Sequence, residues 1–199
     1  MLRPVLLLMV LAALAASLAT SALGVRASVR IEGQTVTLFG GPEPQLEVKA
    51  TALDALEAAS AAGEFYYAVQ QFSFGPFVSQ IGRYPAGGNA GWVFKVNGAS
   101  PPVGADKVEL KEGDRVLWYY ATFGATGGPP TLRLEQRPGG CYQALSQNDA
   151  GVSTPANGAV LVVDSRRRVP TRAGRACPGT HRGLVRATLD GAIRSNAAR

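Results

Sequence analysis

The sequence predicts an α+β fold, in which a mixed β-sheet covered by one helix is followed by a small all-β module. Short segments of alternating apolar and polar residues recur along the chain, and its 24 glycines and 13 prolines favour many turns. Only the segment around residues 51–63 has the spacing of an amphipathic helix. The hydrophobic fraction of 46% is that of a globular protein rather than a disordered one.

The first 27 residues have the features of a secretory signal peptide. Arg3 precedes an uncharged apolar run over Val5–Ala19, and small residues follow. Val25–Ala27 is a suitable cleavage motif, and Thr20–Ala22 is the competing one. Alternatively, Val5–Leu23 stays uncleaved as a membrane anchor, since its length approaches the roughly 20 residues that span a bilayer. We therefore expect a secreted or cell-surface protein.

A shift in charge divides the rest of the chain. Residues 28–130 carry seven Lys or Arg against ten Asp or Glu, whereas residues 131–199 carry eleven Arg against four acidic residues. Such a change of composition indicates a domain boundary. The stretch Gly-Ala-Thr-Gly-Gly-Pro-Pro at 124–130 favours neither helix nor strand and is the expected linker. We therefore expect one domain over residues 28–123 and another over residues 131–199.

The first domain opens with a predicted hairpin and continues into the helix. Ser28–Glu32 alternates apolar with polar residues, and Thr35–Phe39 can pair back with it. Thr51 and Asp54 have the spacing of an N-terminal cap, and Gly63 is a natural stop. The face expected to be buried consists of Leu53, Leu56, Ala59 and Ala62.

Aromatic segments follow the helix. Phe65–Phe74 is expected to be extended and to end at Gly75-Pro76, and Phe77–Ile81 alternates again. In the next strand Trp92, Phe94 and Val96 share one face, and in the last strand Val116, Trp118 and Tyr120 do so. Because Lys95 points away from the Trp92 set, we expect Lys95 in solvent and the aromatic set against the helix. A hairpin, a helix and then several strands is a β-grasp-like order.

Four motifs of this domain occur in register. They are Gly75–Ile81, Gly91–Gly98, Gly104–Asp106 and the Gly113-Asp114 turn before Trp118. Together they resemble the C-terminal β-domain of transcobalamin and intrinsic factor, and more closely the bacterial exported domains grouped with it. The resemblance covers residues 28–122 and implies a β-grasp fold with cobalamin as one possible cofactor. The chain has no helical barrel, so a partner would have to supply the second face of a corrin ligand.

The loop between the two aromatic strands is the expected contact region. Its residues are small, and loops held by rigid strands commonly carry function. A plain connection fixed by Pro101-Pro102 is the alternative. On the other face of the last strand, Tyr119 has no helix to lie under. The expected ligand-binding residues are Asn97, Gly98, Ser100, Val103, Gly104, Ala105, Asp106 and Tyr119.

The second domain is predicted to consist of short strands separated by turns. Gly158–Val160, Thr171–Ala176 and Val185–Ala187 resemble segments of carboxypeptidase-regulatory-like and Ig-like β-sandwich modules of bacterial surface proteins. That resemblance implies a spacer or a binding platform. Arg166–Arg168 lacks interleaved aromatic residues, so we expect no nucleic-acid binding. We expect these three arginines to be solvated charges instead, or to attract anionic wall polymers or lipid head groups.

The two cysteines and the single histidine indicate a disulfide rather than a metal site or a catalytic centre. Cys141 and Cys177 form an even pair in a chain expected to be exported, which favours a disulfide over two free thiols. With the single His181 they lack the spacing of a metal site. We find no nucleophile elbow and no phosphate-cradling glycine motif, so we expect neither catalytic residues nor a bound metal.

Together these observations favour an exported, non-catalytic binding or adhesion protein of the cell envelope. A cobalamin- or corrinoid-binding module that acts with a partner is the first alternative. A structural spacer is the second.

Overall fold

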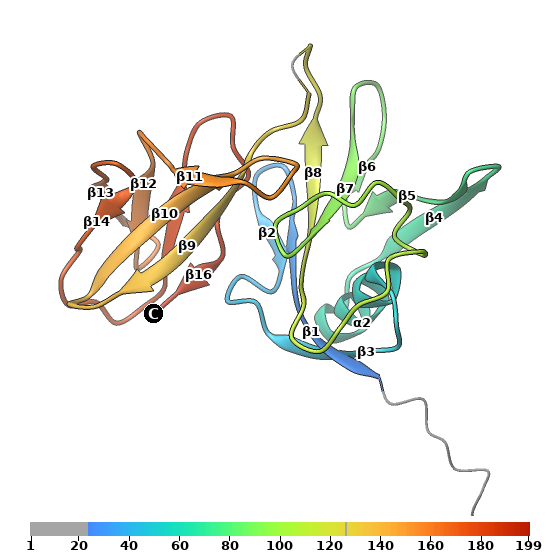
Figure 1. The fold of residues 1–199 in the computed structure, drawn as a ribbon, viewed down its shortest axis with the longest axis horizontal. Coiled ribbons are helices and arrows are strands. Elements are labelled where there is room, and N and C mark those ends of the chain that lie inside the picture. Colours follow the sequence, from blue (N-terminus) through green and yellow to red (C-terminus); the bar gives the residue numbers. More distant parts are fainter. Residues whose placement is uncertain (1–23, 126) are drawn as a thin grey trace, which may run out of the picture.

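The computed structural model describes residues 24–125 and 127–199, and this part of the chain is mostly β-sheet. Strands account for 50% of it and its single helix for 7%. The predicted α+β class, with its β-grasp-like first domain, is therefore wrong. Several separate small sheets form instead, because helix-favouring sequence is confined to the alanine-rich segment after Thr51 while turn residues keep the other elements short. Figure 1 shows two lobes side by side, one carrying the helix.

The first lobe, residues 24–123, is built on a five-stranded sheet. Its order is β2-β1-β8-β7, and β3 also pairs with β1. Only β1 and β8 are parallel neighbours, with Ser28 opposite Arg115. The bounds are Val25–Glu32 for β1, Thr37–Phe39 for β2, Gln45–Val48 for β3, Ala90–Val96 for β7 and Arg115–Thr122 for β8.

The helix α2, Ala52–Gly63, lies against one face of this sheet (Figure 1). The predicted cap is confirmed: Asp54 N donates to Thr51 Oγ1, and the Asp54 carboxylate accepts from Thr51 N. The predicted buried face is only partly right, because Ala62 is exposed. The residues that the helix buries are Ala52, Ala55, Leu56 and Ala59. No helix in the described ranges is long and apolar enough to cross a membrane.

A three-stranded sheet projects from this lobe (Figure 1). It consists of β4 (Tyr67–Phe72), β5 (Gly75–Ile81) and the short β6 (Tyr84–Pro85). The predicted break at Gly75-Pro76 is wrong, since both residues begin β5 and lie opposite Phe72 and Gln71. The turn falls instead on Ser73 and Phe74, which join two strands in a tight hairpin.

The second lobe, residues 131–199, consists of two four-stranded sheets around one apolar core. Leu134, Tyr142, Leu161 and Val185 are among the buried residues of that core. One sheet contains β9 (Thr131–Arg137), β10 (Cys141–Gln147), β11 (Ser153–Pro155) and β14 (Arg175–Ala176). The other contains β12 (Val160–Val163), β13 (Arg167–Pro170), β15 (Val185–Thr188) and β16 (Ala197–Ala198).

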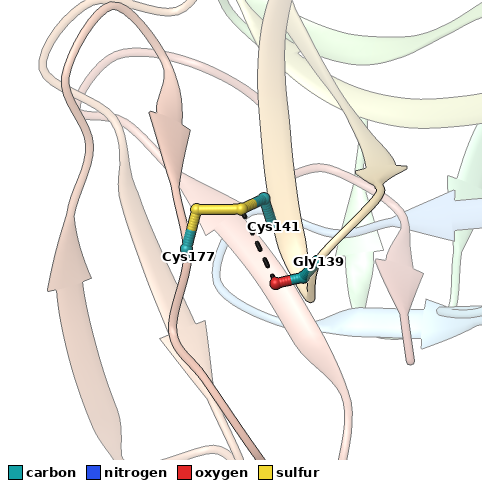
Figure 2. Close-up of a disulfide and its surroundings, with 3 residues drawn as sticks. All are labelled: Gly139, Cys141 and Cys177. Carbon is teal, nitrogen blue, oxygen red and sulfur yellow. Dashed lines mark hydrogen bonds between the residues drawn. A yellow bond between two sulfur atoms is a disulfide. The ribbon is translucent and has the colours of Figure 1, made fainter.

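The predicted disulfide between Cys141 and Cys177 is confirmed. Figure 2 shows the bond between the start of β10 and the segment after β14, with Gly139 beside it. The two Cα atoms are 3.9 Å apart, and 36 positions separate the cysteines in the sequence. The bond therefore ties the β9–β10 hairpin to a long excursion of the chain within the second lobe.

The second lobe covers the sheet face that points away from α2. Leu117, Tyr119 and Ala121 of β8 are buried there, and Ile193 from the second lobe packs against them. The expectation that Lys95 lies in solvent is wrong, because Lys95 is fully buried. The predicted alternation of Lys95 with the aromatic residues is confirmed, but the sheet face on which Lys95 lies packs against the second lobe instead of facing water.

A charged cluster centred on Glu32 of β1 also joins the two lobes. Glu32 is fully buried, and its carboxylate lies 3.1 Å from Arg30 Nη1 and 2.9 Å from Arg194 Nη2. Arg186 Nη1 is 3.6 Å from the same carboxylate. Since Arg186 and Arg194 belong to the second lobe, one acidic side chain of the first lobe binds two arginines across the contact.

Candidate functional site

A groove of about 770 Å³ opens in the first lobe between β5 and the outer edge of β7. Its volume lies within the range of small-molecule sites. Most lining residues are apolar, and the loop that follows β7 closes one side. The main lining groups are Phe74, Pro76, Phe77 and Val78 from the β4–β5 hairpin, Trp92, Val93 and Phe94 from β7, and Ser100, Val103, Gly104 and Ala105 from the loop.

Aromatic side chains at the base of the groove are part of the core, as predicted. The rings of Phe94 and Trp118 stack with centroids 5.0 Å apart. Trp92 Nε1 donates to Tyr84 O at 2.8 Å, and Trp118 Nε1 donates to Ala52 O at 3.2 Å. Both indole N–H groups therefore bond main-chain carbonyls within the protein. The two tryptophans stabilise the packing of the strands and have no free N–H group to donate to a ligand.

Phenylalanines of the β4–β5 hairpin form the outer rim. Phe74 is 76% exposed, and its ring stacks on that of Phe72 at a centroid distance of 5.2 Å. Phe77 meets Phe72 edge to face at 6.0 Å. No charged residue occurs from Phe65 to Gly82. The rim is therefore an uncharged aromatic surface of the kind that marks contact with a ligand or partner.

The structure brings five of the eight predicted site residues to the groove: Ser100, Val103, Gly104, Ala105 and Tyr119. Val103 is 49% exposed, whereas Ala105 is 7% exposed and belongs to the core. The Ala105 carbonyl accepts from Leu53 N in the first turn of α2 at 3.1 Å. Ala105 thus holds the loop to the helix, and Val103 is the loop side chain free to meet a ligand.

The other three predicted residues, Asn97, Gly98 and Asp106, are not among the groove-lining residues. Asn97 has a φ of 53°, and its side chain bonds both Asp114 Oδ1 at 2.8 Å and Arg115 N at 3.0 Å. Asp106 pairs with Lys107 Nζ at 3.0 Å. The contacts of Asn97 fix the end of the β7–β8 pair, a structural role.

The second lobe holds the groove loop in place, which the sequence did not indicate. Ser100 N donates to Asp149 O at 2.8 Å, and Ser100 Oγ donates to Asp149 Oδ1 at 3.2 Å. The same carboxylate lies 3.2 Å from Lys95 Nζ, which also donates to Asn148 O at 2.9 Å. Asp149 itself lines the groove. The one available signal was a lysine in the middle of an aromatic strand.

Tyr119 lies between these groups. Burial, with a further contribution from the Asp149 carboxylate, raises the pKa of Tyr119 to about 12. Lys95 Nζ is 5.9 Å from the centroid of its ring. Burial lowers the pKa of Lys95, and the bond to Asp149 opposes that effect. Tyr119 is therefore held as a neutral phenol beside a buried ammonium group.

His181 lies in the second lobe. Its Nδ1 is 3.0 Å from Gly183 O, and its Nε2 is 2.9 Å from Tyr142 Oη. Because a carbonyl can only accept, Nδ1 carries a proton and donates to Gly183 O, and Nε2 shares a hydrogen bond with the Tyr142 hydroxyl. In residues 24–125 and 127–199 there is no group of three or more His, Cys, Asp and Glu placed to hold a metal ion.

Part of the first lobe is similar to a known protein family. Residues 49–122 match the family described as "Domain of unknown function (DUF4430)". The match runs from the residues that precede α2 to the end of β8, so it includes β5, β7 and the groove loop. No curated protein matches the chain.

Proposed function

We propose that the chain is an exported, non-catalytic binding or adhesion protein of the cell envelope, whose ligand occupies the groove between β5 and β7. The observation that carries this proposal is the groove itself. It joins an uncharged aromatic rim, an aromatic base and a loop with the exposed Val103. Apolar concave surfaces with a few polar groups are the usual form of a binding site.

The resemblance to the transcobalamin and intrinsic factor β-domain supports the same location. Three of its four motifs, Gly75–Ile81, Gly91–Gly98 and Gly104–Asp106, coincide with β5, β7 and the groove loop. All four lie in the segment that matches the domain of unknown function. Cobalamin or another corrinoid is therefore the second candidate, with a partner protein supplying the opposite face of the ring.

Binding can be measured with cyanocobalamin and with the neutral apolar dye Nile red. We expect Val103→Asp to weaken Nile red binding about tenfold, because a carboxylate in an apolar groove is costly to desolvate. Val36→Asp, at a site that is 42% exposed and does not line the groove, is the matched control. Equal dye binding by the two variants would remove the groove from the proposal. Corrin absorbance that co-elutes with the protein would favour the second candidate, a corrinoid-binding module. If neither probe binds, a structural spacer is the remaining candidate.

Export is tested with the full chain expressed in a bacterial host. We expect the protein in the envelope or medium fraction, with the Cys141–Cys177 bond formed. A chain retained in the cytoplasm with two free thiols would contradict the proposed location.

The arginines of the second lobe support an additional attraction to phosphate-bearing envelope components. A hollow of about 480 Å³ near the disulfide is lined by Arg182 and Arg199, and no acidic side chain lines it. Arg166–Arg168 are exposed in the same lobe. We expect retention on soluble polyphosphate, or on phosphatidylglycerol vesicles, that falls steeply as salt rises. Retention that does not change with salt would argue against it.

A further inference from the structure

The hydrogen-bond pattern of β7 determines which of its main-chain groups face the groove. Asn97 N donates to Arg115 O at 2.9 Å, and Phe123 N donates to Asn89 O at 2.8 Å, so the pairs at both ends of the β7–β8 ladder are hydrogen-bonded. Hydrogen-bonded and non-hydrogen-bonded pairs alternate in an antiparallel ladder. Val93 and Lys95 therefore direct their N–H and C=O groups to β8.

The intervening residues of β7 direct these groups away from β8. Val96 exchanges two main-chain bonds with Ala99 on that side, and Ala90 exchanges two with Gly87. By the same alternation, Trp92 and Phe94 direct their N–H and C=O groups away from β8, and both residues line the groove. Among the described residues no strand pairs with this edge of β7. The groove thus presents two N–H and two C=O groups in the spacing of a strand edge.

The charges around the groove restrict what can pair there. Its two charged lining residues, Lys107 and Asp149, are each in an ion pair within the protein. The facing hairpin carries no charge from Phe65 to Gly82. An uncharged segment therefore fits this electrostatic environment, whereas a charged one would be desolvated against apolar walls without a partner.

We propose that the groove binds an uncharged, extended peptide segment of a partner protein, which adds a strand to the outer edge of β7. This inference rests on the groove being the binding site proposed above and names the chemistry of its ligand. The peptide main chain pairs with Trp92 and Phe94. Its alternate side chains contact Phe77 and Val103, in the recognition mode known as strand addition.

Hydrogen exchange of the full-length protein tests the edge without a ligand. We expect the amides of Trp92 and Phe94 to exchange at least about tenfold faster than those of Val93 and Lys95, because only the latter pair with β8. Four amides with equal protection would contradict the assigned pattern and overturn the inference.

A peptide probe tests the pairing. Capped heptapeptides randomised over uncharged residues are selected on the immobilised full-length protein, and the best binder is then N-methylated at each position in turn. Methylation at alternate positions should weaken binding about tenfold, since each removes a main-chain donor, and methylation between them should have little effect. The bound peptide should slow exchange at Trp92 and Phe94.

Three results separate this inference from the proposed function. If no peptide is selected while Nile red still binds in a Val103-dependent manner, the groove is a site but strand addition is wrong. A peptide insensitive to methylation at every position also overturns it. If neither peptide nor dye binds, both proposals fail together.

Discussion

Single buried polar residues decide how this protein is assembled, and Lys95 is the clearest example. Its ammonium group bonds the turn of the second lobe that holds Ser100. From the sequence, period-two alternation placed Lys95 opposite Trp92 correctly. It could not show what covers that face, because alternation gives the direction of a side chain relative to its own strand and carries no information about contacts with distant segments.

Lys95→Met should keep the global stability within about 2 kcal/mol, because an apolar side chain of similar length avoids the desolvation of a buried charge. The loop should nevertheless lose its anchor, so the amide of Ser100 should exchange faster. Thermal unfolding and hydrogen exchange measure the two effects. Lys107→Met, at an exposed pair, is the control. Unchanged exchange at Ser100 would show that Lys95 does not hold the loop.

Tyr119 should make stability depend on pH in the alkaline range. Its pKa is about 12 in the folded protein against 10.0 for the unperturbed group. The folded state therefore keeps the proton more tightly, so the contribution is fully present below pH 10 and is lost as pH rises towards 12. The loss amounts to about 3 kcal/mol at most. Unfolding of the wild type and Tyr119→Phe across this range measures it, and parallel pH profiles would refute it.

Among the elements, local signals predicted well what depends on neighbouring residues. The Thr51–Asp54 cap, the burial of Trp92 and the disulfide followed from spacing, alternation and cysteine count. The start of β5 did not, since Gly75 and Pro76 are turn formers that tertiary pairing with β4 draws into a strand. The fold class failed for a related reason: one short helix among many strands does not make a balanced α+β protein.

The start of β1 has a consequence for processing. Val25–Ala27 pairs with β3, and Ala27 is fully buried. Cleavage after Ala27 would remove three residues of a core strand, so we expect cleavage after Ala22 instead, which leaves β1 intact. The N-terminus of the mature chain, read by mass spectrometry, decides between the two. A mature chain that begins at Ser28 would contradict this expectation.

For the whole molecule, the contact between the lobes limits their independence. The sequence predicted a boundary at residues 124–130 from charge, and that division is still a prediction. The opposite charges of the two segments are in part used across the contact, where Glu43 Oε2 lies 2.5 Å from Arg133 Nη1. Composition records an excess of charge, but it cannot distinguish a charge exposed to solvent from one bound by the other lobe.

Glu32→Gln should destabilise the full chain by about 3–5 kcal/mol, because the mostly buried Arg186 and Arg194 lose the carboxylate that they pair with, while Arg30 keeps its pair with Glu43. Denaturant unfolding of the full-length protein measures this. Glu112→Gln removes an acid from an exposed pair with Arg26 and should have no measurable effect. If the two variants unfold alike, the charged cluster is not what stabilises the lobe contact.

The bond between Ser100 and Asp149 also sets an order of events. The groove loop lies in the first lobe, yet the turn that fixes it is 49 positions further along the chain. If the protein crosses the membrane as an unfolded chain, the first lobe emerges before the second. The groove is then incomplete until the turn that contains Asp149 has crossed the membrane as well. The nascent chain is then unable to retain a ligand on the inner side of the membrane, and binding begins only at the destination.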